Sequence, residues 1–532
     1  MTDLAELAAR HWDAVIVGTG MGGATIGRTL AEAGATVLFV EQGPEGWPAE
    51  EHGLRPDPAD PAARLTRGWW PDRVEGTENG RTRRFFAPLG CGAGGSSVFY
   101  GGALERFERH DFEDIAGLAH PAGGWPVGYD AFLPWYARAE RLFEVSGTPD
   151  PLNPDDSPDL IAPPPLSPGE AAMMARLQAN GLHPYRLHTG LYRRPDCREC
   201  IGHKCPRACK SEARLTGLGP ALATGRAALL ARCPAVRVEG TPGAVTGVVV
   251  RPQDGTDPEL VVRGRVVILA AGAFGSPRLL RASASEIWPD GPGNGTDLAG
   301  RHLMFHVSDL LAVFAGRGPA LEGPRKTLAL RDFYRDGATR LGSFQSMGAP
   351  AGYGNILGFL QDRFDQSPLA RFGALRHGLR LPAAIAARLF GQARIFATVL
   401  EDLPDPENRV LFDPDRPEAV RYSYRISPDL AARRLVLARK VARALRPMRS
   451  LRLTRELMLN HGHPCGTLRF GTDPRTSVLD PACRVHGVDN LHVVDSSFMP
   501  SSAGANPSLT IAANALRVGD IIAGRLQSGE IP

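Results

Sequence analysis

Two polar residues near the C-terminus have the side chains needed to handle the proton of a hydroxyl group. His463 opens the run His-Pro-Cys-Gly-Thr, and Asn506 directly precedes Pro507. A neutral imidazole near pH 7 can accept a proton, and an amide can hold an oxygen atom without competing for that proton. From the residues alone, a satisfied buried histidine and a turn residue before proline are the ordinary interpretations. His461, two positions earlier, is the alternative base.

A glycine-rich turn near the N-terminus predicts a dinucleotide-binding unit. Gly18-x-Gly20-x-x-Gly23 follows a β-branched run at 13–17 and opens a helical pattern, and Glu41 comes 23 residues after Gly18. Such glycines let the backbone approach a pyrophosphate at a helix N-terminus, and the acid accepts hydrogen bonds from a ribose. A ligand-free turn is the alternative, which this context disfavours. The cofactor-binding residues predicted here are Gly18, Thr19, Gly20, Met21, Gly22, Gly23, Glu41 and Gln42.

A second glycine-rich segment, residues 90–102, favours FAD over a nicotinamide cofactor. One Rossmann turn suffices for a nicotinamide cofactor, whereas the longer FAD needs a second backbone cradle beside its flavin ring. A flexible linker would not combine so many glycines with the apolar run Val98-Phe99-Tyr100. The predicted cofactor-binding residues in this segment are Leu89, Gly90, Gly94, Gly95, Ser96, Phe99, Tyr100, Gly101 and Gly102.

Together with four further blocks, these motifs resemble the glucose–methanol–choline (GMC) oxidoreductase family. The blocks span both ends of the chain in the family's order and do not indicate a substrate. They are Trp125-Pro126-Val127-Gly128-Tyr129, the run from Ala270 to Pro277, His463-x-x-Gly466-Thr467, and Val494 to Pro500 followed by Asn506 to Thr510.

The resemblance implies noncovalent FAD, two domains, and His463 with Asn506 as the catalytic pair. Some family members link the flavin to a histidine within the second glycine-rich segment, and residues 90–102 contain none. Val238 is expected to contact the adenine side through its backbone, and Asp495 to lie beside the pyrophosphate or ribityl chain. A helix N-cap is the alternative role for Asp495. The cofactor-binding residues added by the resemblance are Val238, Ala271, Gly272, Asp495, Ser496, Asn506 and Pro507.

The predicted fold class is α/β, or α+β overall. It has a discontinuous Rossmann-type FAD-binding domain and an inserted substrate domain built on an antiparallel sheet with helices. Strands are expected at 13–17, 36–40 and 262–272, and helices at 22–34, within 125–147 and from Ser276. The predicted FAD-binding domain comprises 1–148, 210–302 and 456–532. The predicted substrate domain comprises 149–209, with its cysteine-containing loop, and 303–455.

Four of the eight cysteines fall within 13 residues, at Cys197, Cys200, Cys205 and Cys209. Such a set could hold an iron–sulfur cluster or zinc. Some membrane-linked sugar dehydrogenases of the GMC family carry a cluster in this region, whereas simpler members have structural cysteines there. We favour structural cysteines, reduced or disulfide-linked, and keep the cluster as the alternative.

The charge and apolar pattern of the sequence argue against a nucleic-acid-binding protein and against a membrane-spanning protein. The net charge is +4 without any arginine- or lysine-rich block, so no nucleic-acid partner is expected. The sequence shows no signal peptide and no apolar run of membrane-spanning length, so a cytoplasmic location is expected. A basic, apolar stretch at 368–395 could touch a membrane surface, although an amphipathic helix over the substrate site is the favoured interpretation.

The sequence therefore predicts an FAD-dependent enzyme that oxidises an alcohol, such as a sugar, glycoside or natural-product hydroxyl, to a carbonyl. His463 would take the hydroxyl proton while the flavin N5 takes the hydride. The electron acceptor would be oxygen or another oxidant. One alternative is an electron-transfer dehydrogenase subunit with an iron–sulfur cluster, and the other is a non-redox lyase on the same fold.

Overall fold

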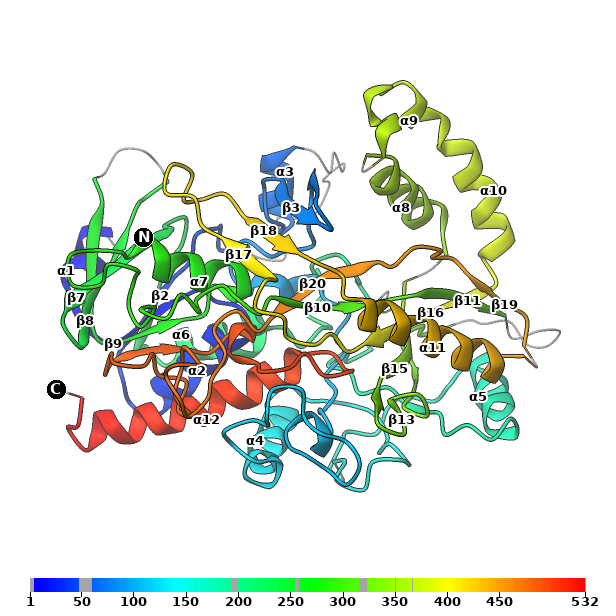
Figure 1. Cartoon of the computed structure of the whole chain (residues 1–532), viewed down its shortest axis with the longest axis horizontal. Helices are drawn as coiled ribbons and strands as arrows, with labels where there is room; N and C mark the ends of the chain where they lie inside the picture. Colours follow the sequence, from blue (N-terminus) through cyan, green and yellow to red (C-terminus); the bar gives the residue numbers. More distant parts are fainter. Residues whose placement is uncertain are drawn as a thin grey trace.

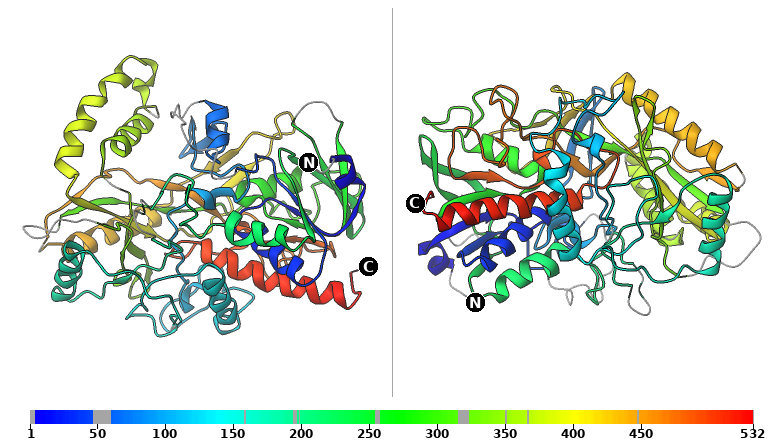
Figure 2. Two further views of the ribbon diagram at one scale, coloured as in Figure 1. Left: turned by 180° about the vertical axis from the view of Figure 1, so that it is seen from behind. Right: turned by 90° about the horizontal axis from the view of Figure 1, so that it is seen from below.

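A computed structural model describes most of the chain. The described residues are 4–46, 60–157, 159–193, 197, 199–253, 258–314, 323–349, 351–365, 367–446 and 448–531. They form two large sheets lying side by side, with helices packed around them (Figures 1 and 2).

The first sheet is the predicted nucleotide-binding sheet, and its central strands are parallel. Its order is β6-β2-β1-β9, and β9 continues both to β21 and to an antiparallel pair, β8 and β7. Buried β-branched runs produce these strands because both faces of the sheet are covered. Its strands are β1 (His11–Val17), β2 (Val37–Val40), β6 (Ala227–Leu230), β7 (Ala235–Thr241), β8 (Ala244–Val250), β9 (Leu260–Leu269) and β21 (Leu491–Val493).

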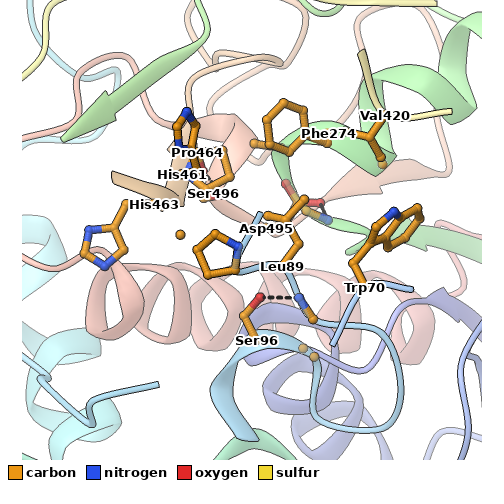
Figure 3. A pocket seen from close by; sticks show the side chains of 18 of the residues that line it. Trp70, Leu89, Ser96, Phe274, Val420, His461, His463, Pro464, Asp495 and Ser496 are labelled. Atoms are coloured by element: carbon orange, nitrogen blue, oxygen red, sulfur yellow. Dashed lines mark hydrogen bonds between the residues drawn. The ribbon is translucent and has the colours of Figure 1, made fainter. Parts of the chain in front are cut away.

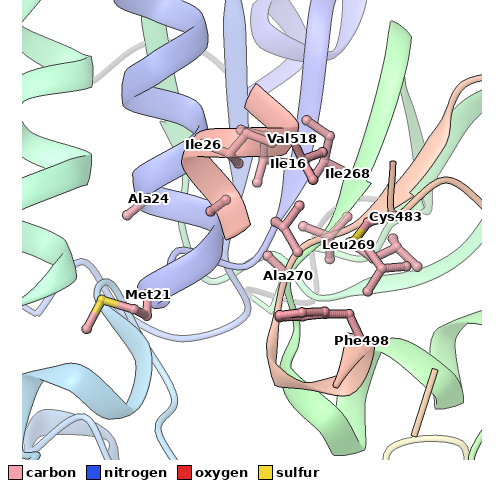
Figure 4. Close-up of a cluster of buried hydrophobic side chains, with 14 of the residues drawn as sticks. Ile16, Met21, Ala24, Ile26, Ile268, Leu269, Ala270, Cys483, Phe498 and Val518 are labelled. Carbon is pink, nitrogen blue, oxygen red and sulfur yellow. The ribbon is translucent and has the colours of Figure 1, made fainter. Parts of the chain in front are cut away.

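Helices from both ends of the chain pack against this sheet. α2 (Met21–Glu32) and α12 (Ser508–Gln527) lie against each other, and α4 (Tyr129–Leu142) packs on α12. Ile16, Ile268 and Val518 lie close together in the resulting core (Figure 4). The remaining elements of this region are α1 (Leu4–Ala9), η2 (Gly95–Val98), η3 (Arg109–Asp111), the π-helix η4 (Arg214–Leu218), α6 (Gly219–Ala223), α7 (Gly272–Ala282) and η6 (Ser496–Phe498).

The second sheet is antiparallel, with the order β19-β11-β16-β15-β12-β5, and β10 joins it beside β16 and β20. α5 (Pro168–Ala179) and α11 (Pro428–Ala444) contribute apolar residues to its core. β20 belongs to the C-terminal segment, so the two regions interleave here. The strands are β5 (Tyr185–Arg186), β10 (Met304–Val307), β11 (Leu310–Phe314), β12 (Leu328–Leu330), β15 (Gly342–Ser346), β16 (Ala393–Leu400), β19 (Ser450–Arg452) and β20 (Leu459–Cys465).

Two smaller sheets and a helical lobe complete the described structure. The four-stranded sheet has the order β17-β18-β3-β4, and a hairpin pairs β13 with β14. Four short helices, which we call the α8–α10 lobe (residues 353–391), project from one edge of the molecule (Figure 1). These elements are α3 (Pro61–Thr66), β3 (Val74–Glu78), β4 (Arg81–Phe85), β13 (Arg335–Asp336), β14 (Thr339–Arg340), α8 (Tyr353–Asp365), η5 (Pro368–Arg371), α9 (Leu375–Gly378), α10 (Arg380–Phe390), β17 (Arg409–Leu411) and β18 (Arg421–Tyr424).

One helix starts earlier than its sequence predicts. We expect a helix from Ser276 with Pro277 near its first position, but α7 begins at Gly272 and contains Pro277 at its sixth position. A proline inside a helix leaves the carbonyl four residues earlier without its usual N–H donor. Here that carbonyl belongs to Ala273, and the Thr467 hydroxyl donates to it at 2.7 Å. Thr467, which is distant in sequence, thus supplies the missing hydrogen bond and permits the longer helix.

Within the described residues, no helix is long and apolar enough to cross a membrane.

Candidate active site

A cavity of about 1220 Å³ lies between the two large sheets and is lined by residues from the whole length of the chain. Ordinary small-molecule sites have volumes of about 300–1,000 Å³, so this cavity has room for a long cofactor and a substrate together. Figure 3 shows part of its wall, including His463, Asp495 and Ser96. Of the site residues predicted from the sequence, only Gly23, Gly94, Gly102 and Val238 are absent from the wall.

Two glycines of the first glycine-rich turn have different surroundings: Gly18 is packed against the protein, and Gly20 faces open space. Gly18 has φ +99°, and a Cβ there would lie 2.4 Å from the carbonyl oxygen of Ala270. At Gly20, by contrast, a Cβ would meet no protein atom within 4 Å. Gly20 lines the cavity and caps the N-terminus of α2. Such open backbone at a helix N-terminus suits a pyrophosphate.

Glu41 joins the two glycine-rich segments. Its Oε2 accepts a hydrogen bond from the Thr19 hydroxyl at 2.7 Å, and its Oε1 accepts from the N–H groups of Gly43 at 3.0 Å and Gly92 at 3.2 Å. Its position at the end of β2 is the one that the ribose role requires. The carboxylate also holds the loops of the site together, a role that the sequence did not indicate.

The second glycine-rich segment lies directly against the first. The Gly94 N–H donates to the Thr19 hydroxyl at 3.2 Å, and a Cβ on Gly95 would lie 3.0 Å from the Cα of Gly20. Within the segment, the Gly90 N–H donates to the Ser96 hydroxyl at 2.9 Å (Figure 3). The structure thus brings together the two backbone cradles that the sequence places far apart.

Three of the four predicted residues outside the wall support it. A Cβ on Gly23 would lie 2.0 Å from the carbonyl oxygen of Gly18, so this glycine allows close packing of helix and strand. Gly94 and Gly102 have positive φ values, +89° and +67°, that shape the second segment.

The prediction for Val238 is not supported by the geometry. Its backbone N–H donates to the Ser283 hydroxyl at 2.8 Å, and the residue is buried and does not line the cavity. Pro234, Ala235 and Val236 line it instead. No motif in the sequence indicates which residue of this stretch faces the cavity.

His463 lies on β20, half-buried, beside the fully buried His306. Its Nδ1 is 3.1 Å from Nδ1 of His306, and the Nε2 of His306 is 3.0 Å from the carbonyl oxygen of Ala503. A carbonyl only accepts, so the His306 Nε2 carries hydrogen. Burial lowers the pKa of His306 to about 4, so the ring is neutral and its Nδ1 is an acceptor.

This chain of contacts is consistent with one tautomer of His463. In that tautomer its Nδ1 donates to His306, which leaves the lone pair on Nε2. The Nδ2 atom of Asn460 also lies 3.2 Å from the His463 Nδ1. That contact cannot be a second hydrogen bond in the same tautomer, because one ring nitrogen has either a hydrogen or a lone pair. Burial, with the nearby His306 and Lys326, lowers the pKa of His463 well below its usual value, so the ring is a neutral base near pH 7.

Asn506 is held in one orientation by Gln345 of β15. The Gln345 Nε2 donates to the Asn506 Oδ1 at 2.8 Å. With that oxygen engaged, the Asn506 amide N–H groups are the donors that a ligand oxygen could use. Both residues line the cavity.

His461, the alternative base, is engaged elsewhere. Its Nε2 lies 2.9 Å from a Glu78 carboxylate oxygen and 3.0 Å from the Tyr422 hydroxyl. Burial opposes ionisation of Glu78, but the hydrogen bond and charge of His461 outweigh it and lower the pKa of Glu78 to about 2. Figure 3 shows the His461 and His463 rings well apart. The geometry therefore favours His463 as the base.

Asp495 combines its two predicted placements. It lines the cavity, and its side chain also caps η6 by accepting from the Ser497 N–H at 2.9 Å. The same carboxylate accepts from the Gly272 N–H at 2.9 Å, so it ties η6 to the start of α7. Burial raises its pKa above the usual value.

The wall around His463 includes residues that no motif identified. Lys326, Gln345 and Met347 come from β15 and its surroundings, and Phe359 and Arg363 come from α8. Gln345 lies on β15, Lys326 and Met347 lie in the loops beside β12 and β15, and none of these residues shows a recognisable spacing of functional groups. Only the pairing of β15 and β16 with their neighbours brings them to the site.

The cysteine-containing loop packs beneath the second glycine-rich segment. The Gly202 N–H donates to the Phe99 carbonyl at 2.8 Å, and the buried Lys210 ammonium donates to the Val98 and Cys200 carbonyls at 3.1 and 2.8 Å. Cys197, Cys200, Cys205 and Cys209 form no disulfide. Across the described part of the chain, no three His, Cys, Asp or Glu side chains are arranged to hold a metal. The geometry thus lends no support to the iron–sulfur cluster.

Comparison with known proteins identifies the family. Residues 12–299 match the N-terminal domain of GMC oxidoreductases, and residues 402–515 match the C-terminal domain. The chain belongs to the GMC oxidoreductase family. It is an FAD-dependent oxidoreductase that acts on the alcohol group of a small molecule.

Two curated GMC relatives resemble the chain over nearly its whole length. One is 6'''-hydroxyparomomycin C oxidase of Streptomyces lividus, 31% identical over 98% of this chain and 92% of the relative. The other is paromamine 6'-oxidase of Streptomyces fradiae, 30% identical over 98% of this chain and 92% of the relative. A solved structure of Aspergillus oryzae formate oxidase shares the fold, with a TM-score of 0.67 at 16% identity over 98% of this chain and 99% of that chain.

Proposed function

We propose that this GMC oxidoreductase oxidises the hydroxyl group of an alcohol that carries no positive charge and has a largely apolar body. In this proposal His463 accepts the hydroxyl proton and Asn506 orients the oxygen. The observation that carries the proposal is the contact between the half-buried His463 and the fully buried His306, because a hydrogen bond from Nδ1 to His306 leaves a basic Nε2 on a neutral ring.

The proton chemistry follows from the burial of His463. Its lowered pKa keeps the imidazole neutral at physiological pH, so it can accept a proton without first losing one. FAD, when bound, supplies the acceptor for the hydride that leaves the carbon. Exclusion of water by the surrounding sheets would keep the proton transfer between the hydroxyl and the imidazole.

Asn506 suits the substrate oxygen because its own oxygen is already engaged. Gln345 donates to the Asn506 Oδ1, so the Asn506 N–H groups can donate to the alcohol. A donor at that place leaves the hydroxyl hydrogen for His463. The two residues would thus hold one oxygen atom from two sides and orient the carbon beside it.

The wall beside Gln345 and Asn506 supports an apolar, uncharged substrate. Leu310 and Ala397 are paired across β11 and β16, and both line the cavity with Met347 and Val399. The buried Lys326 also lines this part, and its Nζ lies 3.5 Å from the Ser346 carbonyl oxygen. A fixed positive charge inside a low-dielectric cavity repels a cationic substrate.

The two similar enzymes are named as oxidases of 6'''-hydroxyparomomycin C and of paromamine. Their names make a sugar-like hydroxyl a natural candidate for this chain. Lys326 and the apolar wall argue against a polycationic substrate here. We therefore place the substrate among neutral alcohols rather than amino sugars.

The test is anaerobic reduction of the bound flavin by a matched pair of alcohols. 1-Hexanol and 6-amino-1-hexanol have the same chain length and differ by one cationic group. We expect bleaching of the flavin absorbance by 1-hexanol at a much higher second-order rate constant than by the amine. Faster bleaching by the amine would contradict the substrate class, and no bleaching by either alcohol would contradict the proposed apolar alcohol substrate. Adding oxygen or a dye to the reduced enzyme then separates an oxidase from a dehydrogenase.

A further inference from the structure

The α8–α10 lobe concentrates exposed apolar side chains that the catalytic role does not explain. Among the described residues, fourteen large hydrophobic side chains are exposed, and eight of them lie within 353–389. Scattered exposed apolar residues are normal, but a contiguous group marks an interaction surface. The eight are Tyr353, Phe359, Leu369, Phe372, Leu375, Leu381, Ile385 and Leu389.

α10 carries the most exposed part of this surface. Leu381, Ile385 and Leu389 are spaced four residues apart, which places them in one stripe along the helix. Their exposed fractions are 69%, 54% and 61%. Ala383, by contrast, is fully buried, and α10 packs against α8. The small side chain therefore faces the protein, while the large apolar ones face outward.

The same segment is strongly basic. Residues 367–391 contain four arginines and one histidine, and no aspartate or glutamate. Arg376 pairs with Asp365 of α8 at 3.0 Å. Arg371, Arg380 and Arg388 form no ion pair with any carboxylate in the described parts of the chain. An apolar stripe flanked by unneutralised arginines is the pattern of a helix that lies in a membrane interface.

We propose that the α8–α10 lobe docks on the surface of a membrane that contains anionic lipids. Leu381, Ile385 and Leu389 would enter the boundary between headgroups and acyl chains, and the arginines would contact lipid phosphates. The lobe projects from the body in two opposite views, so it can reach a flat surface (Figures 1 and 2). This inference goes beyond the proposed function and does not depend on it.

Charge favours a membrane over a second copy of the chain. A two-fold dimer through this lobe would bring the same basic surface of both copies face to face, with like charges opposed. An anionic membrane complements that charge.

Phe359 and Arg363 of α8 also line the main cavity, so the lobe and the substrate site share a wall. Docking would hold that wall near the lipid.

The experiment is flotation of the FAD-loaded enzyme with vesicles. One preparation is phosphatidylcholine alone, and the other is phosphatidylcholine mixed with phosphatidylglycerol. We expect the enzyme to float only with the anionic vesicles, and to be released at about 1 M salt, where the Debye length falls to about 3 Å. Arg380→Gln and Arg388→Gln should each lower the partition coefficient about five-fold.

Two sets of variants test the surface itself. Leu381→Ser, Ile385→Ser and Leu389→Ser combined should abolish flotation. The matched control combines Ile161→Ser with Arg141→Gln, two exposed residues outside the lobe, and should float like the unchanged enzyme. Retained flavin absorbance in every variant shows that the body of the enzyme is folded.

Three outcomes would overturn the proposal. The first is no flotation of the unchanged enzyme with either vesicle. The second is equal flotation of the lobe variant and the control. The third is a dimer in analytical ultracentrifugation that the triple serine variant converts to a monomer without any vesicle binding, which would assign the surface to a second copy. None of these results depends on whether the enzyme oxidises the alcohols tested above.

Discussion

The Nδ1 atoms of His463 and His306 lie 3.1 Å apart, and the two rings meet edge to face with centroids 5.0 Å apart. The contact arises because β20 and β10 are antiparallel neighbours, with His306 opposite Asn460 and a shift in register between Met304 and His306. His306 also contacts the carbonyl oxygen of Ala503, three residues before Asn506. One fully buried imidazole thus touches the chain segments of both proposed catalytic residues.

Replacing His306 should slow the reaction without weakening substrate binding. His306→Leu removes the acceptor for the His463 Nδ1–H, so the ring can place its hydrogen on Nε2 and lose its basic lone pair. We expect flavin reduction to slow by about 10-fold or more, toward the lower end of a general-base effect. His306→Asn, which can restore an acceptor, should recover part of the rate. Stopped-flow reduction over a range of alcohol concentrations separates rate from binding, and a full-speed Leu variant would refute the positioning role.

Removing His463 and removing His461, the two histidines of β20, should have very different effects on the rate of flavin reduction. His463→Ala should slow flavin reduction by about 10²–10⁴-fold, the usual contribution of a general base. His461→Ala is the matched control, because it removes a neighbouring imidazole that is bonded to Glu78 rather than placed as the base. Its effect on the reduction rate should be small. Equal losses in the two variants would mean that the base has been assigned to the wrong ring.

The charge of Lys326 gives a pH-dependent substrate preference. Burial lowers its pKa to about 8, so it is cationic near pH 7 and becomes neutral as the pH rises through that value. The preference for 1-hexanol over 6-amino-1-hexanol should therefore fall above pH 8, while the amine itself is still charged. Lys326→Met should show a weak preference at every pH. Ratios of kcat/KM measured between pH 6 and 9 test this, and identical profiles for both enzymes would exclude Lys326 as the cause.

Valine substitutions at two glycines of the first turn should have different effects on folding and on FAD binding. At Gly20 a Cβ meets no protein atom, so Gly20→Val should leave the fold intact and lose FAD because the side chain enters the cofactor space. At Gly18 a Cβ collides with the Ala270 carbonyl and φ is +99°, so Gly18→Val should reduce soluble, folded protein as well. Flavin content and circular dichroism distinguish the two. Tight flavin binding by the Gly20 variant would contradict the assigned pyrophosphate site.

A buried arginine should contribute strongly to stability. Arg331 follows β12, is fully enclosed, and donates to Glu105 at 2.8 Å, to Glu108 at 3.1 Å and to the Tyr185 hydroxyl at 3.2 Å. Arg331→Met leaves those carboxylates without their cation and should lower the free energy of unfolding by about 3–5 kcal/mol.

An exposed arginine provides the control for that measurement. Arg475 pairs with Asp473, but its side chain is 85% exposed. Arg475→Met should therefore leave the free energy of unfolding nearly unchanged. Urea unfolding of the FAD-loaded enzymes compares the two, and equal losses would contradict the importance of burial.

Much of the nucleotide-binding region could be predicted because its signals are local. A continuous β-branched run, three spaced glycines and an acid at the end of the next strand define β1, the turn and Glu41 within some thirty residues. Backbone conformation at such glycines is fixed by steric limits that any fold must respect. The GMC motifs added His463, Asn506 and Asp495, and all three line one cavity.

The start of α7 and the substrate wall could not be predicted in the same way. α7 extends back to Gly272 because Thr467, nearly two hundred residues away, satisfies the carbonyl that Pro277 leaves open. Lys326, Gln345 and Met347 carry no motif and reach the site only through the pairing of β15 with its neighbours.

Local glycine spacing and strand patterns in the sequence predict the cofactor cradle, and the GMC motifs identify the family and point to His463 and Asn506 as the catalytic pair. Tertiary structure alone decided which nitrogen of His463 is basic, since that depends on His306 from another strand and on the Ala503 carbonyl. The fold also leaves Leu381, Ile385 and Leu389 of the basic stretch exposed while Ala383 is buried. The tautomer of a histidine and the exposed face of a helix both depend on the residues around them. When those residues are distant in sequence, they come together only when the chain folds.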